Sequence, residues 1–167
     1  MSNGIKVRLS TEDDSHMIEM LLDSCFGAMS LREFKENICG RYLLAFVDNR
    51  LVGMTGLSFN KEYDGFEIDW TCTHPEYRKR GIMHELFKRI CALTDGDIYC
   101  SCWGMRGEAI HMRSVMRDFG FEPVVRNRVT WDSRYNCHCD NSDCVMHRRQ
   151  ANCSCYEDLY LRRSKHE

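Results

Sequence analysis

The strongest constraint on the fold is a strand that ends in a basic turn just before a helix. Residues 66–73 read as a strand, Pro75 breaks it, and a helix begins at Gly81 after three basic residues. Helix N-termini leave backbone N–H groups unpaired and carry partial positive charge, so they attract phosphate groups. A glycine at that point lets a ligand approach the backbone closely. The segment predicts a phosphate-binding turn; the plainer alternative is a solvated, charged turn that opens a surface helix.

Hydrophobic periodicity predicts an α/β chain on either side of this segment. The helix that begins at Gly81 has apolar residues at helical spacing up to Leu93, and Thr11 with Asp14 is a helix-capping pair. The expected strands cover residues 5–9, 41–47, 51–59, 66–73, 97–101, 122–132 and 157–162, with further helices at about 17–25, 31–38 and 108–118. Residues 48–50 are expected to form a hairpin turn.

Length and charge narrow the class of protein. A chain of 167 residues is the usual size of one domain with its own core. The 23 basic and 25 acidic residues nearly balance, so nucleic acid is not an expected partner. The N-terminus lacks the pattern of a secretory signal, and no stretch approaches the roughly 18 apolar residues of a membrane helix. We expect a cytoplasmic protein without a membrane partner.

The order of the expected elements resembles the GNAT acetyltransferase superfamily over nearly the whole chain. The pyrophosphate-binding signature of that family is Gln or Arg, two residues, Gly, one residue, then Gly or Ala; here Arg78, Gly81 and Met83 occupy its defined positions. A second family mark is the Gly-Phe pair at Gly120 and Phe121. The resemblance implies a mixed, mostly antiparallel sheet of about seven strands with four helices, as a single acetyltransferase-like domain over residues 1–167.

The resemblance also implies acetyl-CoA as cosubstrate. In the family, free backbone N–H groups of the fourth strand hold the thioester carbonyl, a position that falls here on Cys72 and Thr73, close to the turn. The side chain of Cys72 need not act, and a small buried strand residue is its plainer interpretation. The residues that the resemblance assigns to the pyrophosphate are Arg78, Lys79, Arg80, Gly81, Ile82, Met83 and His84.

Three positions depart from the family pattern. Met83 replaces the usual Gly or Ala, and its side chain either crowds the pyrophosphate or turns into the core. The family often has a tyrosine four residues before the Gly-Phe glycine as general acid for the leaving thiolate, and Met116 stands there. Ala109 replaces an asparagine that is common near the start of the same helix. The proton donor is therefore unassigned.

Two carboxylates are candidates for the general base. Glu67 and Asp69 lie two residues apart on a strand, so they share a face. Glu67 lies eleven residues before Arg78, which matches the place of the glutamate base in the histone-acetylating branch of the resembled family. A carboxylate there can deprotonate an ammonium directly or through water. An exposed acidic strand face is the alternative.

The 11 cysteines are the anomaly of the composition. Residues 133–156, between the last two expected strands, form a polar, Cys-rich insertion without periodicity. Zinc would explain how such a segment is ordered, because it favours thiolate and imidazole ligands; disulfides and reduced thiols are the alternatives. The candidate zinc ligands are Cys137, Cys139, Cys144, His147, Cys153 and Cys155. For Cys100 and Cys102, core packing is the expectation.

Taken together, the residues and the resemblance predict an acetyl-CoA-dependent N-acetyltransferase. It would transfer the acetyl group directly to a primary amine, in a small molecule or a peptide, within a ternary complex. A non-catalytic acyl-CoA-binding or metal- and redox-sensing module on the same fold is the alternative. A homodimer is compatible with either hypothesis.

Overall fold

The computed structural model describes residues 4–26, 38–105, 112–128 and 155–164. Seven strands form one sheet in the order β1-β2-β3-β4-β5-β7-β6. Neighbouring strands are antiparallel except β4 and β5, which are parallel. The strands are β1 (Lys6–Leu9), β2 (Tyr42–Val47), β3 (Arg50–Asn60), β4 (Gly65–Thr73), β5 (Ile98–Met105), β6 (Glu122–Arg128) and β7 (Cys155–Arg162). The expected mixed, mostly antiparallel sheet is confirmed.

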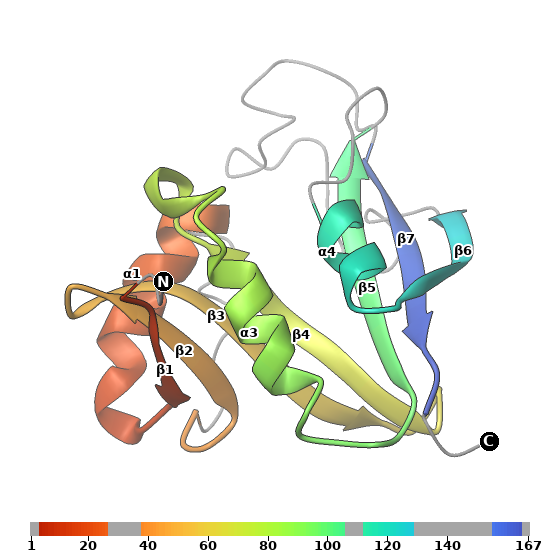
Figure 1. Ribbon diagram of the computed structural model, residues 1–167, viewed down its shortest axis with the longest axis horizontal. Coiled ribbons are helices and arrows are strands. Elements are labelled where there is room, and N and C mark those ends of the chain that lie inside the picture. Colours follow the sequence, from red (N-terminus) through yellow and green to blue (C-terminus); the bar gives the residue numbers. More distant parts are fainter. Residues whose placement is uncertain (1–3, 27–37, 106–111, 129–154, 165–167) are drawn as a thin grey trace, which may run out of the picture.

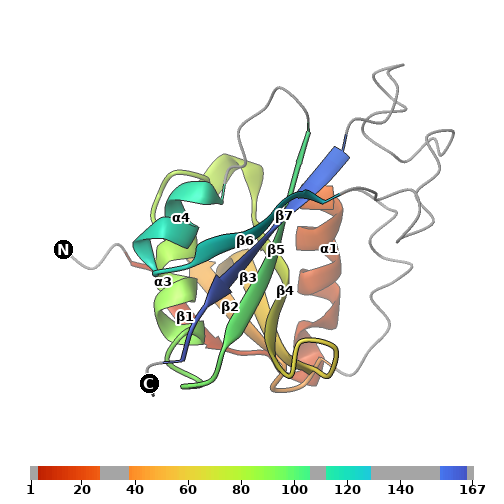
Figure 2. The same ribbon diagram turned by 90° about the vertical axis from the view of Figure 1, so that its right-hand side faces the viewer.

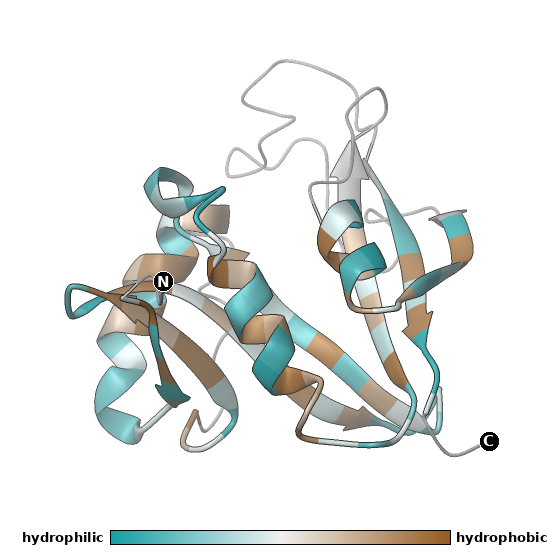
Figure 3. Cartoon of the chain, in the orientation of Figure 1, coloured by the Kyte–Doolittle hydropathy of each residue, from teal (hydrophilic) through white to brown (hydrophobic). Residues whose placement is uncertain are grey.

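Helices cover both faces of the sheet. Helix α1 (Ser15–Phe26) packs on one face, and helices α3 (Ile82–Ile90) and α4 (Arg113–Asp118) pack on the other (Figure 2). Each face has its own apolar core: Ile18 and Leu22 of α1 belong to one, and Leu86 and Phe87 of α3 to the other. Figure 3 shows hydrophobic and hydrophilic bands alternating along α3, as expected for a helix that buries one side.

The tight turn between β2 and β3 follows the sequence signal closely. Asp48 and Asn49 join β2 to β3, and both have positive φ, 49° and 62°. This backbone matches the right-handed twist of the flanking strands, and Asn and Asp adopt it more readily than most residues. The expected hairpin turn is confirmed.

The ends of several elements differ from the expectation. Helix α3 ends at Ile90, and Leu93, expected on its apolar face, is 58% exposed beyond the helix end. Strand β5 continues to Met105 because it pairs with β7 along its whole length, whereas the sequence predicted an end at residue 101.

The C-terminal elements also begin or end elsewhere. Helix α4 covers Arg113–Asp118, and residues 108–111 of the expected helix lie outside the described residues. Strand β7 begins at Cys155, two residues earlier than expected. Strand β6 ends at Arg128, so residues 129–132 of the expected strand lie outside the described residues. Most of the helix expected at 31–38 also lies outside them, and Ile38, which is described, is not helical.

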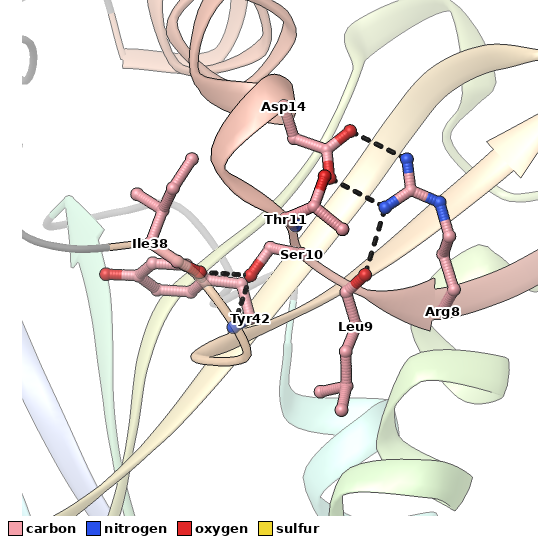
Figure 4. A network of polar contacts seen from close by, with 7 residues as sticks. All are labelled: Arg8, Leu9, Ser10, Thr11, Asp14, Ile38 and Tyr42. Atoms are coloured by element: carbon pink, nitrogen blue, oxygen red, sulfur yellow. Dashed lines mark hydrogen bonds and ion pairs between the residues drawn. The ribbon is translucent and has the colours of Figure 1, made fainter.

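A polar network ties β1 to the helical segment that follows it (Figure 4). Asp14, in a 3-10 turn (Glu12–Asp14) just before α1, accepts two 2.6 Å hydrogen bonds from Arg8 and one of 2.7 Å from the backbone N–H of Thr11. The guanidinium of Arg8 holds the pKa of the buried Asp14 carboxyl at about 2. The hydroxyl of Ser10 donates to the carbonyl of Ile38. The network fixes the position at which α1 leaves the sheet.

None of the described helices combines the length and the apolar character that crossing a bilayer requires.

Candidate functional site

The turn between β4 and α3 has the backbone of an anion site. After a 3-10 turn (Pro75–Tyr77), Arg78 is extended, Lys79 has a φ of 62° and Gly81 a φ of 81°. Left-handed residues in such a turn aim backbone N–H groups into a shared concavity. Gly81 precedes the first turn of α3 and supplies no side-chain cap. The N–H groups of the turn and the helix start are therefore placed to receive a phosphate.

The side chains of the turn add exposed positive charge. Arg78, Lys79 and Arg80 are all exposed. The guanidinium of Arg80 lies 4.9 Å from the centre of the Tyr77 ring, and that of Arg50 lies 5.5 Å from the same ring. Stacking on an aromatic face orders a guanidinium without neutralising it. The turn consequently keeps a strong positive field.

The first residues of α3 divide between the core and the surface. Ile82 is buried, and Met83 is partly buried and packs against the core below it. The side chain of Met83 thus turns towards the core, which was one of the two alternatives for this residue; the other was that it crowds the pyrophosphate. His84 is exposed, and its Nε2 lies 3.0 Å from Oδ2 of Asp118 on α4. The contact lowers the pKa of the Asp118 carboxyl.

Strands β4 and β5 separate at the level of the expected thioester site. Their three register pairs end at Ile68 with Cys100, although β4 runs on to Thr73 and β5 to Met105 (Figure 1). Beyond Ile68, the described part of β4 has no ladder partner in β5. Its register with β3 also shifts here, where Trp70 has a φ of 44°. Such a φ is unusual for a bulky residue, and bulges of this kind re-aim strands beside functional sites.

Cys72 lies in the separating part of β4 but turns its thiol into the core beside α1. It is 6% exposed, and it belongs to the apolar core between α1 and the sheet. The neighbouring thiol of Cys25 and burial raise the pKa of the Cys72 thiol. The side chain is therefore core packing. Thr73 pairs with Gly53 of β3, and its carbonyl accepts a 3.4 Å hydrogen bond from Nε of Arg78.

Glu67 is held by one neighbour. Nδ2 of Asn60, on the adjacent strand β3, donates a 2.6 Å hydrogen bond to Oε2 of Glu67. No other side chain in the described part of the chain hydrogen-bonds this carboxylate. Glu67 is half-buried and pairs in register with Tyr99 of β5. One oxygen is thus fixed while the other can receive a proton.

Asp69 is more fully engaged than Glu67. Its Oδ2 accepts hydrogen bonds of 3.3 Å from Arg41 and 3.2 Å from Ser58. Its Oδ1 is buried against Gly56, and a β-carbon added at Gly56 would lie 2.0 Å from this oxygen. Burial and the negative charge of Asp69 together raise the pKa of Tyr42 to about 12. The geometry favours a positioning role for Asp69, which braces β4 against β2 and β3.

Three features of the site were not predicted from the sequence. Asn60 is the partner of Glu67, and only the register of the β3–β4 hairpin would have revealed it. The Asp69 carboxylate fits against Gly56 because this residue has no side chain. Glu157 is 3% exposed on β7, opposite the partner strand β5, although the sequence indicated only a strand start there.

The family position of the general acid supplies no proton donor. Met116 lies on α4, and its side chain is fully buried in the core that α3 and α4 share with the sheet, so its role is core packing. Ala109 lies outside the described residues.

The zinc prediction falls almost wholly outside the described residues. This applies to Cys137, Cys139, Cys144, His147 and Cys153, whereas Cys155 is described as the first residue of β7. Within the described ranges, no three His, Cys, Asp or Glu side chains are grouped as a metal site. Cys100 and Cys102, expected in the core, are indeed buried there.

Comparisons of the sequence and of the structure with known proteins identify the same family. A model of the acetyltransferase (GNAT) family matches residues 9–104, more than half of the chain. A GNAT-family acetyltransferase from Bacillus cereus has a similar structure, with a TM-score of 0.63, 18% identity, and coverage of 96% of this chain and 97% of its own. No curated protein matches the sequence.

Two further structures carry more specific names. The ribosomal-protein-S18-alanine N-acetyltransferase of Escherichia coli gives a TM-score of 0.59 at 10% identity, with 94% of this chain and 90% of that one covered. N-acetylglutamate synthase of Neisseria gonorrhoeae, complexed with coenzyme A and N-acetyl-glutamate, gives 0.60 at 16% identity and covers 98% of this chain. The chain spans only about a third (35%) of the synthase. At these identities the likeness establishes the fold.

Proposed function

The chain belongs to the GNAT acetyltransferase family, and on that premise we propose that it transfers an acetyl group from acetyl-CoA to a primary amine within a ternary complex. The observation that carries the proposal is the course of β4. The same strand loses its β5 partner after Ile68 and then leads, through Thr73, into the anion-binding turn at residues 78–81. A single extended ligand with a pyrophosphate and a thioester fits both features.

The cofactor would be held mainly by backbone. The pyrophosphate would lie at the N–H groups of residues 78–84, with the charges of Arg78, Lys79 and Arg80 around it. The pantetheine and thioester would follow β4 at Cys72 and Thr73, and their carbonyls would accept hydrogen bonds from backbone N–H groups on the side of the strand that faces away from β3. Since these donors are backbone groups, the burial of the Cys72 thiol does not interfere with this role.

The chemistry requires a neutral amine and a stabilised oxyanion. Glu67 would accept the proton of the ammonium, directly or through water, while Asn60 holds its other oxygen. The amine nitrogen then attacks the thioester carbon, the carbon–sulfur bond breaks, and the CoA thiolate leaves and takes up the second proton that the nitrogen loses. Backbone N–H groups of β4 would stabilise the negative oxygen that forms during attack.

The acceptor is proposed to be a small-molecule or peptide amine. The names of two structural neighbours refer to the synthesis of N-acetylglutamate and to the N-acetylation of an alanine of a ribosomal protein. Both acceptor sizes therefore occur on this fold, and fold alone does not choose between them. A cytoplasmic location and a homodimer are compatible with this proposal.

Glu67→Gln tests the assignment of the base. A positioned general base contributes roughly 10²–10⁴-fold to the rate. We expect kcat to fall by that factor, while the Kd for acetyl-CoA stays unchanged because Glu67 lies away from the pyrophosphate turn. Glu62→Gln is the matched control, since it removes one carboxylate from the same hairpin at an exposed position. Equal kcat values in the two variants would remove Glu67 from the mechanism.

The kinetic pattern tests direct transfer. A ternary complex predicts intersecting double-reciprocal lines when the amine and acetyl-CoA are varied together. The acetylated product is measured by mass spectrometry, because the thiols of the protein would react in an assay that uses a thiol reagent. Parallel lines would indicate an acetyl-enzyme instead. A protein that binds acetyl-CoA and acetylates no amine would support the non-catalytic acyl-CoA-binding module.

A zinc ion in the Cys/His-rich insertion is a separate part of the proposal. Its support is the chemistry of the candidate ligands, which are residue types that zinc prefers: Cys137, Cys139, Cys144, His147, Cys153 and Cys155. Metal analysis of protein purified without chelator should find one equivalent of zinc. A folded, fully reduced and metal-free protein would contradict the assignment.

A further inference from the structure

A bulge in β4 carries a threonine at the opening between β4 and β5. Between two register pairs, β4 has Trp70 and Thr71 where β3 has only Thr55. Such an extra residue is a β-bulge, which re-aims side chains of the strand that contains it. Oγ1 of Thr71 lies 2.8 Å from Oγ1 of Thr55. The last residue of β4 with a ladder partner in β5 is Ile68, so Thr71 lies in the separated part of the strand.

The side chain of Thr71 projects from the face of the sheet that α3 and α4 cover. Thr55 pairs with Leu43 of β2, which belongs to the core on that face. Side chains of directly paired residues lie on the same face of a sheet. Thr71 shares the face of Thr55, because their hydroxyls are in contact.

The proposed base projects from the opposite face. Asp69 pairs with Gly56, and Gly56 pairs with Tyr42, which belongs to the core beneath α1. Glu67 lies two residues before Asp69 and therefore shares its face. Thr71 and Glu67 thus lie on opposite faces of β4, at the strand where the acetyl group would be transferred.

The two threonine hydroxyls differ in what they can donate to. Thr55 is 0% exposed, and Thr71 is the hydrogen-bond partner of its hydroxyl among the described residues, so the Thr55 hydroxyl donates to Thr71. The Thr71 hydroxyl has one proton of its own. Its acceptor is the backbone carbonyl of Asp69, at a long 3.3 Å. Because Thr71 is partly exposed, this proton can turn to a stronger acceptor that arrives beside β4.

We propose that the Thr71 hydroxyl donates a hydrogen bond to the CoA sulfur as this becomes a thiolate, with Thr55 as the positioning residue. The inference rests on the proposed function. The anion-binding turn leads into α3, so the cofactor would reach β4 from the face of Thr71. When the carbon–sulfur bond breaks, its electron pair goes to sulfur and Thr71 keeps its own proton. The thiolate then takes the second proton of the amine nitrogen.

Substitutions that keep or remove the hydroxyl test the assignment. Thr71→Val keeps the branched shape and should lower kcat by roughly 10-fold or more, the loss expected for one hydrogen bond to a charged group. Thr71→Ser should restore most of the rate. Thr94→Val is the matched control and should leave kcat unchanged, because the Thr94 hydroxyl accepts a hydrogen bond from Gly96 in the turn between α3 and β5.

A double variant protects the test against a failure to fold. Thr71→Val leaves the buried Thr55 hydroxyl without its acceptor, which destabilises the fold. Thr55→Val/Thr71→Val removes both hydroxyls, and replacing both partners of a hydrogen bond by apolar groups costs far less. The double variant should show the same loss of kcat as Thr71→Val.

A binding measurement separates a contact with sulfur from a merely structural role. CoA and desulfo-CoA, in which hydrogen replaces the thiol, are titrated by calorimetry between about pH 7 and 9.5, where a thiol ionises. The wild-type protein should increasingly prefer CoA as pH rises, because Thr71 stabilises the thiolate. Ionisation of the protein's own thiols affects both ligands and cancels. At about pH 9.5 the preference for CoA should be roughly 10-fold smaller in Thr71→Val.

Two results would overturn the inference. One is a kcat of Thr71→Val, or of the double variant, that equals the kcat of Thr94→Val. The other is a preference for CoA that rises equally with pH in the wild type and in Thr71→Val. A wild-type protein that binds neither acetyl-CoA nor CoA would contradict the proposed function itself, whereas an active wild type with an unimpaired Thr71→Val refutes the role of Thr71 alone.

Discussion

Gly81→Ala separates backbone conformation from ligand binding at the turn. Gly81 has a φ of 81°, and a β-carbon placed on it would meet no atom within 4 Å. The variant therefore introduces no clash. Its cost to folding is the left-handed conformation of a non-glycine residue, about 1–2 kcal/mol. For a domain of this size, that loss lowers the unfolding midpoint by about 2–8 °C.

The same methyl group has a second consequence for acetyl-CoA. It projects into the open space beside the turn, from which the pyrophosphate would approach the backbone N–H groups. Loss of one hydrogen bond to a charged group costs about 1.5–3 kcal/mol. That corresponds to a Kd roughly 10-fold to 150-fold weaker.

Gly120→Ala is the matched control for the turn variant. Gly120 has a φ of 74°, and its β-carbon would also meet nothing within 4 Å, but it follows α4 and is not one of the residues of the turn. Both variants should lose similar stability in thermal unfolding. Calorimetric titration should then show weaker acetyl-CoA binding for Gly81→Ala alone. Equal Kd values for the two variants would refute the placement of the pyrophosphate at this turn.

Three further substitutions test the surroundings of the site. Asp14→Asn removes a carboxylate whose pKa Arg8 holds at about 2. Because Arg8 is half exposed and solvent screens the ion pair, the expected loss of stability is about 1–2 kcal/mol in urea unfolding at pH 7. The lowered pKa stabilises the fold above about pH 4, so this difference should shrink as pH falls from 4 to 2; a constant difference would contradict the ion pair. Gly56→Ala should displace the Asp69 carboxylate and lower the unfolding midpoint, and an unchanged midpoint would contradict their close contact. Met116→Tyr should cost about 1–3 kcal/mol by overpacking and leave kcat no higher, whereas a raised kcat would show that the position reaches the leaving thiolate.

Local signals in the sequence were sufficient for the features that depend on a few neighbouring residues. The turn at residues 78–81 combines glycine with basic residues at a helix start, and the β2–β3 turn needs residues that tolerate positive φ, as Asp48 and Asn49 do. The apolar spacing of α3 identified its buried face up to Ile90.

Features that depend on distant contacts were not predictable in this way. Strand β5 continues to Met105 because β7 pairs with it, although the two are far apart in the chain. The separation of β4 from β5 coincides with the irregular register at Trp70, which has no local signature. The surroundings of Glu67 and Asp69 differ because Glu67 contacts Asn60 and Asp69 lies against Gly56, and alternation along a strand does not encode such contacts.

The central claim is that acetyl-CoA binds through both the turn and the open side of β4. The most direct test is the thermal unfolding midpoint of the reduced protein with acetyl-CoA and, separately, with S-acetylpantetheine, which lacks the pyrophosphate. At about 100 times its Kd, acetyl-CoA should stabilise the fold by roughly 2.7 kcal/mol, which is a rise of several degrees. S-acetylpantetheine at the same concentration should produce a much smaller rise. An unchanged midpoint with millimolar acetyl-CoA would contradict the claim.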